Sequence, residues 1–576
     1  MISLPIPADR LQQMQLPARA VATVGMLVAG FSVMMSWAYP PSALDNVTFY
    51  GAPSPLQWHF LALCVLGAAC FAVPFLGRAR LGRWTRIVAW NAAARTAALG
   101  AAAAAAVAIA AITIESGGLV NTDPGVWVGL GGSLVAAGCG LVLPGSPEPG
   151  MGRLKSPTWL QIVGITLGIA AVLFAAVFLL SLNEGGEMFF YVALVVSLIL
   201  TLKEFGIFGW FATAVSLNKR VVVAAAFVAA FVFPFTQGGS DQNMSIAAQV
   251  LVFAATALGL NIVVGLVGLL DLGYIAFLGA GAFTAAMLSG SAFATIGWEP
   301  PFWLTALISA TIASILGLLI GSPTLRVSGD YLAIVTLAFG EIFRITMINL
   351  DGTDGPNLTH GPNGIPGIPN LNFFGFDFGK TQEFFGIETG RFANYFWLML
   401  LVLAFIIIVF TNLNRSRIGR GWVAIREDEL AAEAMGVNTF ALKLLAFAGG
   451  AFLAGLAGAV KAHQDTSVVP EQYVFLESAF LVAAVVLGGM GTVMGVLIGA
   501  TILKVLPEKL RFFSDYRLLL FGLLMVFMMR FRPEGIIADE RRQLEFHADD
   551  EELAEELEEE LIVHQAHYNP DLKGDA

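Results

Sequence analysis

Residues 244–290 read MSIAAQVLVFAATALGLNIVVGLVGLLDLGYIAFLGAGAFTAAMLSG, and Asp271 is the one charged residue in this stretch. A helix needs about 20 apolar residues to cross a bilayer, so the stretch is about twice as long as one membrane span. Glycines recur between 265 and 273, and glycine permits backbone turns that other residues resist. The sequence therefore predicts two apolar helices here, joined by a break within residues 265–273.

Apolar runs recur along nearly the whole chain of 576 residues. Hydrophobic residues make up 57% of it and charged residues 13%, whereas a soluble protein is about 25% charged. A transmembrane barrel would instead show alternating segments of roughly ten residues. The sequence thus predicts an all-α protein, a polytopic transmembrane helical bundle with broken or re-entrant hairpins and about 14–16 membrane segments.

The distribution of charge orients these spans. Residues 539–576 hold 14 acidic and 3 basic residues, which accounts for the whole net charge of -11. Elsewhere Lys and Arg gather in loops such as 415–443, and basic loops stay on the cytoplasmic side of a membrane. The Gly-, Pro- and Asn-rich loop at 351–394 is then expected outside, with the N- and C-termini both cytoplasmic. Nothing in this pattern indicates a nucleic-acid partner.

One apolar segment permits two interpretations. Lys203 and Glu204 interrupt the sixth segment from the N-terminus. Charges inside a membrane are costly, so the segment is either a tilted span or a shorter helix followed by an interfacial one over residues 203–218.

A second apolar stretch, 475–506, is interrupted by glycines at 488–491. Non-helical backbone at membrane depth is tolerated where protein buries it or where it lines a cavity. The two breaks are therefore the predicted translocation path, with helix packing through small residues as the alternative. The residues assigned to this path are Asn261, Gly265, Gly268, Asp271, Gly273, Tyr274, Glu341, Glu477, Gly488, Gly489 and Gly491.

Two other groups of polar residues have simpler interpretations. Glu341 and Arg344 are spaced i, i+3 on one predicted helix, which equally suits a structural ion pair. His360 and His463 are expected in outside loops without partners at ligand spacing, so no metal site is predicted.

The segment 415–436, RSRIGRGWVAIREDELAAEAMG, is too polar to cross the membrane. Its acidic residues lie near the start of a predicted short helix, where the helix dipole favours them. The small apolar patch of Ala431, Ala432, Ala434 and Met435, closed by Gly436, suits insertion into a groove on a partner. An ordinary amphipathic connector is the alternative.

This segment resembles the cytoplasmic coupling loop of ABC importer permeases, with Glu433-Ala434-Met435-Gly436 in place of the EAA-and-glycine pattern. More closely, GRGWVAIREDELAAEAMG resembles the loop of the M-type (LivM-type) permeases of branched-chain amino-acid ABC importers. The resemblance covers about residues 221–537. Further matching stretches follow in order: ALGLNIVVGLVGLLDLGYIAFLGAGAF (257–283), LRVSGDYLAIVTLAFGEIFRI (325–345), HGPNGI (360–365), ESAFLVAAVVLGGMG (477–491) and RPEGI (532–536).

The resemblance implies a subunit that moves branched-chain or other aliphatic or neutral amino acids through the bacterial inner membrane. The implied partners are two ABC ATPase subunits, a second, H-type permease, a periplasmic or lipid-anchored substrate-binding protein, and membrane lipid. Catalytic residues and cofactors are not expected in this chain, because ATP and Mg would be bound by the ATPases. The residues implied to contact them are Arg426, Glu427, Asp428, Glu429, Ala431, Ala432, Glu433, Met435 and Gly436.

Three regions result. Residues 1–218 are an N-terminal extension of about six spans, 219–537 the permease core with its coupling helix near 420–438, and 538–576 an acidic cytoplasmic tail. A permease of the same fold for urea or short amides is the alternative function, and an ion-driven secondary transporter a weaker one, because such a carrier needs no coupling loop. Neither a GxxxxGK[ST] phosphate loop nor the convergent acid and histidine cluster of a membrane enzyme occurs in the sequence.

Overall fold

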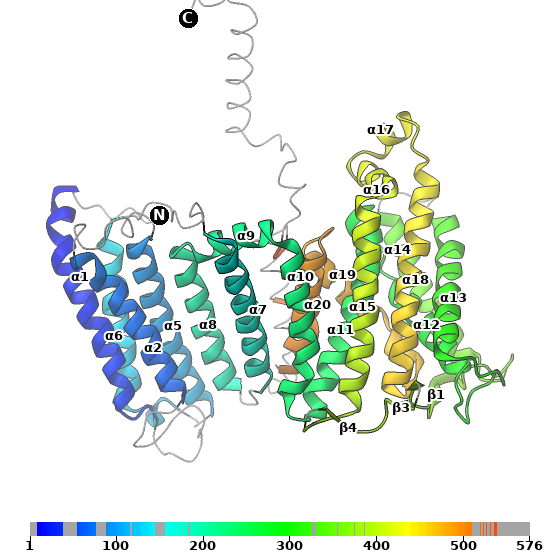
Figure 1. Ribbon diagram of the computed structural model, residues 1–576, viewed down its shortest axis with the longest axis horizontal. Coiled ribbons are helices and arrows are strands. Elements are labelled where there is room, and N and C mark those ends of the chain that lie inside the picture. The colour runs from blue at the N-terminus through cyan, green and yellow to red at the C-terminus, as the bar shows by residue number, and fades with distance from the viewer. Residues whose placement is uncertain are drawn as a thin grey trace, which may run out of the picture. The chain divides into compact units, whose positions relative to one another are not determined.

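The computed structural model describes residues 8–38, 55–76, 88–115, 118–144, 156–181, 185–324, 330–353, 355–373, 375–384, 386–509 and 535–537, with 519, 522, 523, 526 and 530. Within these residues, 11 helices are long and apolar enough to cross a membrane, or 12 if a bent pair forms one span. The predicted polytopic helical bundle is confirmed (Figure 1). The predicted acidic tail, residues 538–576, lies outside the described residues.

The chain forms two compact units, one of residues 1–244, 382–389 and 509–514, the other of 245–381, 390–508 and 515–576. The first contains eight described helices: α1 (Ala8–Phe31), α2 (Pro55–Ala72), α5 (Trp90–Glu115), α6 (Pro124–Val142), α7 (Thr158–Ser181), α8 (Gly185–Glu204), α9 (Ile207–Leu217) and α10 (Lys219–Val232). Short 3-10 turns extend some of them: η1 (Ser32–Met34), η2 (Val73–Leu76), η3 (Leu119–Asn121) and η5 (Phe233–Gln237).

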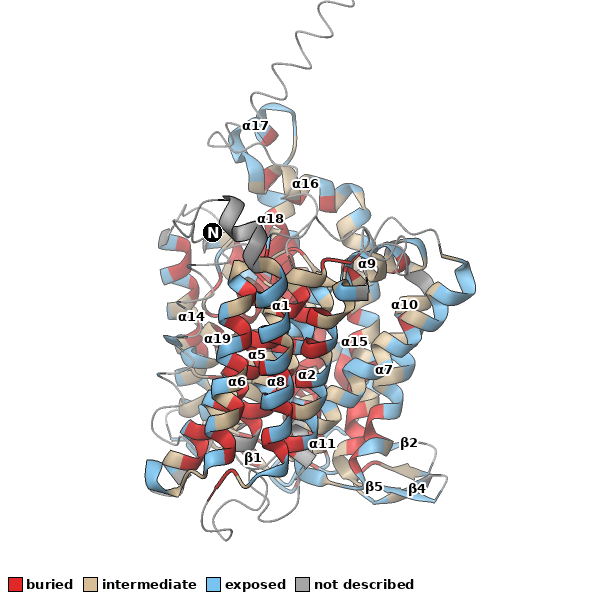
Figure 2. Cartoon of the chain, turned by 90° about the vertical axis from the view of Figure 1, so that its left-hand side faces the viewer, coloured by how far each residue is buried: buried red, intermediate tan, exposed pale blue. Residues whose placement is uncertain are grey.

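Small residues set the packing of the first unit. The alanine-rich α5 lies between α6 and α8, and 61% of its apolar core is buried, against 6% for α7. Figure 2 shows this contrast as buried red on α5 and exposed blue on α7. Where α1 crosses α6, a Cβ at Gly25 would lie 2.8 Å from the carbonyl oxygen of Gly132. Glycines thus let the two backbones approach closely, as membrane helices require when lipid is as apolar as their side chains.

The sixth apolar segment is bent. α8 ends at Glu204, α9 begins at Ile207, and the two helix axes differ by 80°. Gly206 makes the bend in a left-handed conformation, with φ of 79°. Of the two interpretations, the continuous tilted span is wrong, and the division into two helices is confirmed, with the second helix beginning at Ile207 and not at residue 203. The interfacial position of the second helix stays a prediction.

The second unit begins inside α11 (Asp241–Asn261) and is organised around α18 (Thr439–Asp465), against which α12 (Ile275–Met287) and α13 (Phe302–Thr324) pack. A Cβ at Gly281 of α12 would lie 2.3 Å from the carbonyl oxygen of Gly455 in α18, so this core too depends on glycine contacts. The remaining helices are η6 (Ile262–Leu266), α14 (Asp330–Asn349), η7 (Gly361–Asn363), α15 (Arg391–Arg415), α16 (Arg417–Glu427), α17 (Glu429–Ala434), η8 (Pro470–Tyr473), α19 (Phe475–Gly488) and α20 (Val493–Lys509).

The loop between α14 and α15 contains short antiparallel strands that the sequence did not predict. Two of the three strand pairs are hairpins with tight turns, in which Gly375 and Gly386 have φ of 86° and 78°. The pairs are β1 (Ile365–Pro366) with β6 (Ser467–Val468), β2 (Asn372–Phe373) with β3 (Phe376–Asp377), and β4 (Gln382–Phe384) with β5 (Ile387–Thr389).

His463 lies elsewhere than predicted. It belongs to the last turn of α18, not to a loop, and only 6% of it is exposed. Its Nδ1 lies 3.0 Å from the carbonyl oxygen of Pro369, so the ring joins α18 to the loop that contains Pro369.

Candidate functional site

The first break is a π-helical turn followed by a glycine turn. α11 widens into η6 at Ile262, and Gly268 then reverses the chain with φ of 80°. π-helical turns are rare and often occur at functional sites. The break predicted at 265–273 is confirmed, and every residue of η6 is buried.

The second break separates α19 from α20. Gly489 and Gly491 have φ of 122° and 81°, which side-chain-bearing residues adopt only with strain. A Cβ at Gly488 would lie 2.1 Å from the carbonyl oxygen of Gly495, so the hairpin closes only without a side chain there. The predicted interruption at 488–491 is confirmed, and the backbone N–H groups of Ile536 and Ile537 donate to the carbonyls of Leu487 and Gly488 at 2.9 and 3.0 Å.

Asn261 joins the two breaks. Its side chain is fully buried, its Oδ1 accepts from the N–H of Gly491 at 2.9 Å, and its Nδ2 donates to the carbonyl of Thr492 at 3.3 Å. Gly265 lies against both groups, because a Cβ there would be 2.0 Å from Asn261 Oδ1 and 2.6 Å from Gly491 N. Three of the predicted path residues, Asn261, Gly265 and Gly491, thus form one contiguous buried structure.

Asp271, Gly273 and Tyr274 serve the packing around the first break. Asp271 is buried and accepts from the N–H of Gly273 at 2.9 Å. A Cβ at Gly273 would lie 1.9 Å from the carbonyl oxygen of Thr336, so this glycine seats the break on α14. Tyr274 is also buried, and its hydroxyl donates to the carbonyl of Gly450 in α18 at 2.6 Å.

Glu341 lies apart from the breaks. Arg344 donates to both of its carboxylate oxygens from Nε at 3.0 and 3.1 Å, and also reaches Glu471 from Nη1 at 3.0 Å. The structural ion pair that the i, i+3 spacing suggested is confirmed. The side chains of this pair are partly exposed, and the bond from Arg344 to Glu471 joins α14 to η8.

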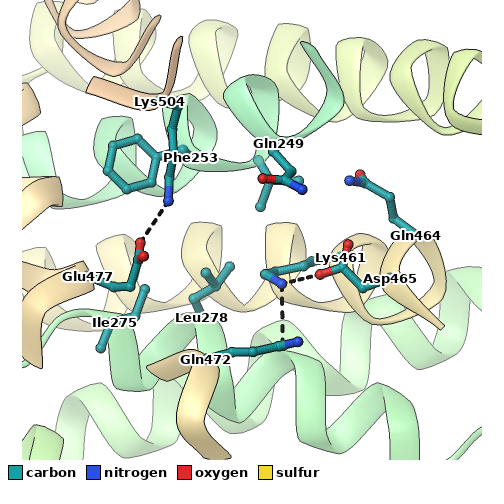
Figure 3. A pocket seen from close by; sticks show the side chains of 11 residues that line it. Gln249, Phe253, Ile275, Leu278, Lys461, Gln464, Asp465, Gln472, Glu477 and Lys504 are labelled. Carbon is teal, nitrogen blue, oxygen red and sulfur yellow. Dashed lines mark hydrogen bonds and ion pairs between the residues drawn. The ribbon is translucent and has the colours of Figure 1, made fainter. Parts of the chain in front are cut away.

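Glu477 lines a pocket of about 260 Å³ in the second unit (Figure 3). Its Oε2 accepts from Lys504 Nζ at 2.8 Å, and that ammonium also lies 4.6 Å from the centre of the Phe253 ring. Sequence reasoning singled out Glu477 but missed the other polar residues of the wall, which are Gln249, Lys461, Gln464, Asp465, Gln472 and Lys504. Of these, Lys504 could have been found, because it is a charged residue within the apolar stretch 475–506.

The segment predicted to contact a partner forms two helices at one end of α18, with β1 and β3 at its other end (Figure 1). Asp428 ends α16 and caps α17 by accepting from the N–H of Ala431 at 2.9 Å. Gly436 ends the segment with φ of 83°. Trp422, buried in α16, donates from Nε1 to the carbonyl of Leu442 at 2.8 Å and so fixes the segment to α18.

The exposed face of α17 differs in part from the predicted patch. Ala432 is 5% exposed and packs inward, so it cannot contribute to a contact surface. Leu430 and Met435 are 78% and 85% exposed, and Ala431 and Glu433 are exposed as well. Glu429 lies on another face, where its carboxylate pairs with Lys443 Nζ at 2.5 Å.

Arg426 connects this segment to the first break. Its Nη1 donates to the carbonyl of Gly265 at 2.8 Å, and a Cβ at Gly268 would lie 2.7 Å from its Cγ. The guanidinium also pairs with Glu427 at 3.0 Å. Through Arg426, Gly265 and Asn261, the polar segment, the first break and the second break are in continuous contact.

The chain resembles known transport proteins over its second unit. Residues 242–529 match the family described as branched-chain amino acid transport system / permease component. The high-affinity branched-chain amino acid transport system permease protein LivM of Escherichia coli is 39% identical over 341 residues, which is 57% of this chain and 77% of the relative. The probable branched-chain amino acid transport permease protein LivM of Methanocaldococcus jannaschii is 26% identical over 312 residues, 49% and 84% of the two chains.

A permease with a different named cargo also matches. The ribose import permease protein RbsC of Haemophilus influenzae is 29% identical over 284 residues, 47% of this chain and 77% of the relative. No solved structure matches the chain significantly. The family match spans half of the chain, and the Escherichia coli relative is covered over more than two thirds of its length. The chain therefore belongs to the family of branched-chain amino acid transport system permease components.

Proposed function

We propose that this chain is the M-type permease subunit of an ATP-driven ABC importer. It moves branched-chain or other aliphatic or neutral amino acids that a periplasmic or lipid-anchored binding protein delivers to the bacterial inner membrane. The observation that carries the ATP-driven part of this proposal is the bond from Arg426 to the carbonyl of Gly265. Through this bond, the exposed segment 415–436 contacts the first break in the membrane helices directly.

The exposed face of α17 suits docking on a partner. Leu430 and Met435 offer apolar contact, and Glu433 adds a charge that a basic groove would complement. Because Trp422 and the pair Glu429–Lys443 hold the segment on α18, a push on α17 is transmitted to the bundle as a rigid movement. In the proposal the partners at this face are two ABC ATPase subunits.

The breaks are the elements that move. A bundle of unbroken helices resists deformation, whereas glycine turns such as Gly268 and Gly491 absorb changes in φ and ψ. Arg426 lies on one break, and Asn261 carries its displacement to the other. We propose that a second, H-type permease lies opposite and that both termini of this chain are cytoplasmic.

The proposal is tested by purification from the native membrane. The affinity-tagged chain should bring down two ATPase subunits and a second permease in a stable assembly. The chain stripped of these partners should not hydrolyse ATP, because nucleotide binding and hydrolysis belong to the ATPases. ATP turnover by the isolated, contaminant-free chain would overturn the proposal.

A further inference from the structure

The pocket beside Glu477 contains charges of both signs in equal number. α18 supplies Lys461 and Asp465, and α19 and α20 supply Glu477 and Lys504. Lys461 pairs with Asp465 and lies 3.4 Å from Gln472 Oε1, while Lys504 pairs with Glu477 at 2.8 Å. A charge within a membrane bundle is costly unless it is paired. The wall is therefore electrically balanced and favours neither a net cation nor a net anion.

The two ion pairs lie at opposite ends of the pocket, with Leu278 and Gln249 between them (Figure 3). At the α18 end, Lys461, Gln464 and Asp465 are spaced i, i+3 and i+4, so they share one face of the helix. This end offers a cation, an anion and an amide within little more than one helical turn. A ligand that carries an ammonium and a carboxylate on one carbon matches that set.

Besides the charged groups on α18, the side chain of Gln464 also indicates a ligand. Its side chain is fully buried and lines the pocket, yet neither its Nε2 nor its Oε1 has a hydrogen-bond partner. Figure 3 shows the amide directed into the pocket from the α18 end. A buried amide without partners is costly, and native structures rarely leave one unsatisfied. A carboxylate would accept from its Nε2, and an ammonium would donate to its Oε1.

Apolar side chains make up another part of the wall. Phe253, Ile275 and Leu278 line it from α11 and α12. The volume of about 260 Å³ lies just below the range of roughly 300–1,000 Å³ found for drug-sized ligands. Size and lining both suit a small molecule with an aliphatic portion.

We propose that this pocket holds a zwitterionic aliphatic α-amino acid in transit, with its carboxylate on Lys461 and Gln464, its ammonium on Asp465 and its side chain against Phe253 and Leu278. In the absence of a ligand, Lys461 and Asp465 neutralise each other. The ligand separates them and replaces one ion pair by two. The inference deepens the proposed function and rests on it.

The first test uses the unmodified chain in its purified assembly with the partner permease and ATPases, without the binding protein. Equilibrium binding of radiolabelled L-leucine is measured against two competitors, 3-methylbutylamine, which lacks the carboxylate, and 4-methylpentanoate, which lacks the ammonium. Both analogues should compete at least about ten-fold more weakly than leucine, because each leaves one charged group of the pocket without a partner on the ligand. Equal competition, or no binding of leucine to this assembly, would overturn the inference.

The second test locates the site. Lys461→Gln and Asp465→Asn should each weaken leucine binding by about ten-fold or more. Lys380→Gln and Asp377→Asn are matched controls, because this ion pair joins its side chains at 3.4 Å in the loop before α15, away from the pocket. Unchanged binding in the pocket variants, or equal loss in the controls, would refute the assignment. If a charged variant fails to assemble, Gln464→Leu, which leaves the Lys461–Asp465 pair in place and should also weaken leucine binding, tests the same location.

Uptake separates the two hypotheses. If the unmodified assembly takes up no amino acid with ATP and binding protein present, the proposed function itself fails. If the unmodified assembly transports leucine and the Lys461→Gln assembly transports it with unchanged saturation, only the pocket assignment fails.

Discussion

Asn261 shows how one amide can join distant parts of the chain. Its two polar atoms are used by Gly491 and Thr492, some 230 residues away in sequence. A polar residue in an apolar run indicated from the sequence that Asn261 has a specific role. Its partners could not be predicted, because they depend on how the α19–α20 hairpin packs against η6.

Arg426 is the residue whose loss should separate ATP hydrolysis from transport. We expect Arg426→Gln to leave the chain inserted and assembled, because α16 remains fixed by Trp422. The charge-assisted bond to the Gly265 carbonyl, worth about 1.5–3 kcal/mol, would be lost. Leucine transported per ATP hydrolysed should therefore fall several-fold.

The measurement is uptake and ATP hydrolysis on the same reconstituted vesicles. Arg417→Gln is the control, because Arg417 is an exposed arginine on the same helix. An unaltered ratio in the Arg426 variant would contradict transmission through this contact.

The charged residues of the pocket mark a limit of sequence reasoning. Glu477 is conspicuous in an apolar run, and so is Lys504, but their pairing requires the α19–α20 hairpin to close. Lys461 and Asp465 look like the polar end of a span, which is also what they are in α18. Only the three-dimensional arrangement brings these two ends to one cavity.

At the level of elements, α17 should act as the docking helix. We expect Gly436→Leu to fold and insert but to transport poorly. Its φ of 83° costs a side-chain-bearing residue roughly 1–2 kcal/mol, so the end of α17 would change its path. Glu433→Lys should impair transport as well, because it reverses a charge on the exposed face.

Uptake into vesicles and substrate-stimulated ATP hydrolysis are measured together for both variants. Gly386→Leu is the matched control, since Gly386 has φ of 78° and open space around it in the β4–β5 turn. Normal transport by both α17 variants, fully assembled with their ATPases, would show that α17 is not the docking element.

Hydropathy and glycine positions predicted the helices and their interruptions well where the apolar stretches were long. Both breaks were predicted, because apolar stretches much longer than one 20-residue span must be interrupted. The bend near Lys203 was one of two interpretations that the sequence left open. The strands between α14 and α15 were missed because pairs of two or three residues carry too little pattern to predict. Ala432 was misassigned because a six-residue helix gives no clear period from which to tell its buried face.

For the whole chain, membrane orientation is the prediction that follows from loop charge. A cysteine at Asn357, an exposed position in the loop after α14, should react with an impermeant maleimide added to intact cells. A cysteine at Ser416, where α15 meets α16, should react only after permeabilisation, because the surrounding basic loop remains inside.

The unmodified chain gives the background labelling of the natural cysteines. This background should be low, because Cys64 and Cys70 are buried and Cys139 is partly buried. Labelling in the reverse pattern would show that the second unit has the opposite orientation in the membrane.

The most direct test of the chain's function is uptake of radiolabelled leucine into vesicles that contain the complete assembly and its binding protein. We predict that uptake requires ATP and the binding protein, and that it falls strongly when this chain is replaced by the Gly436→Leu variant. Uptake that proceeds without ATP, driven by an imposed ion gradient, would contradict an ATP-driven importer and indicate a secondary transporter.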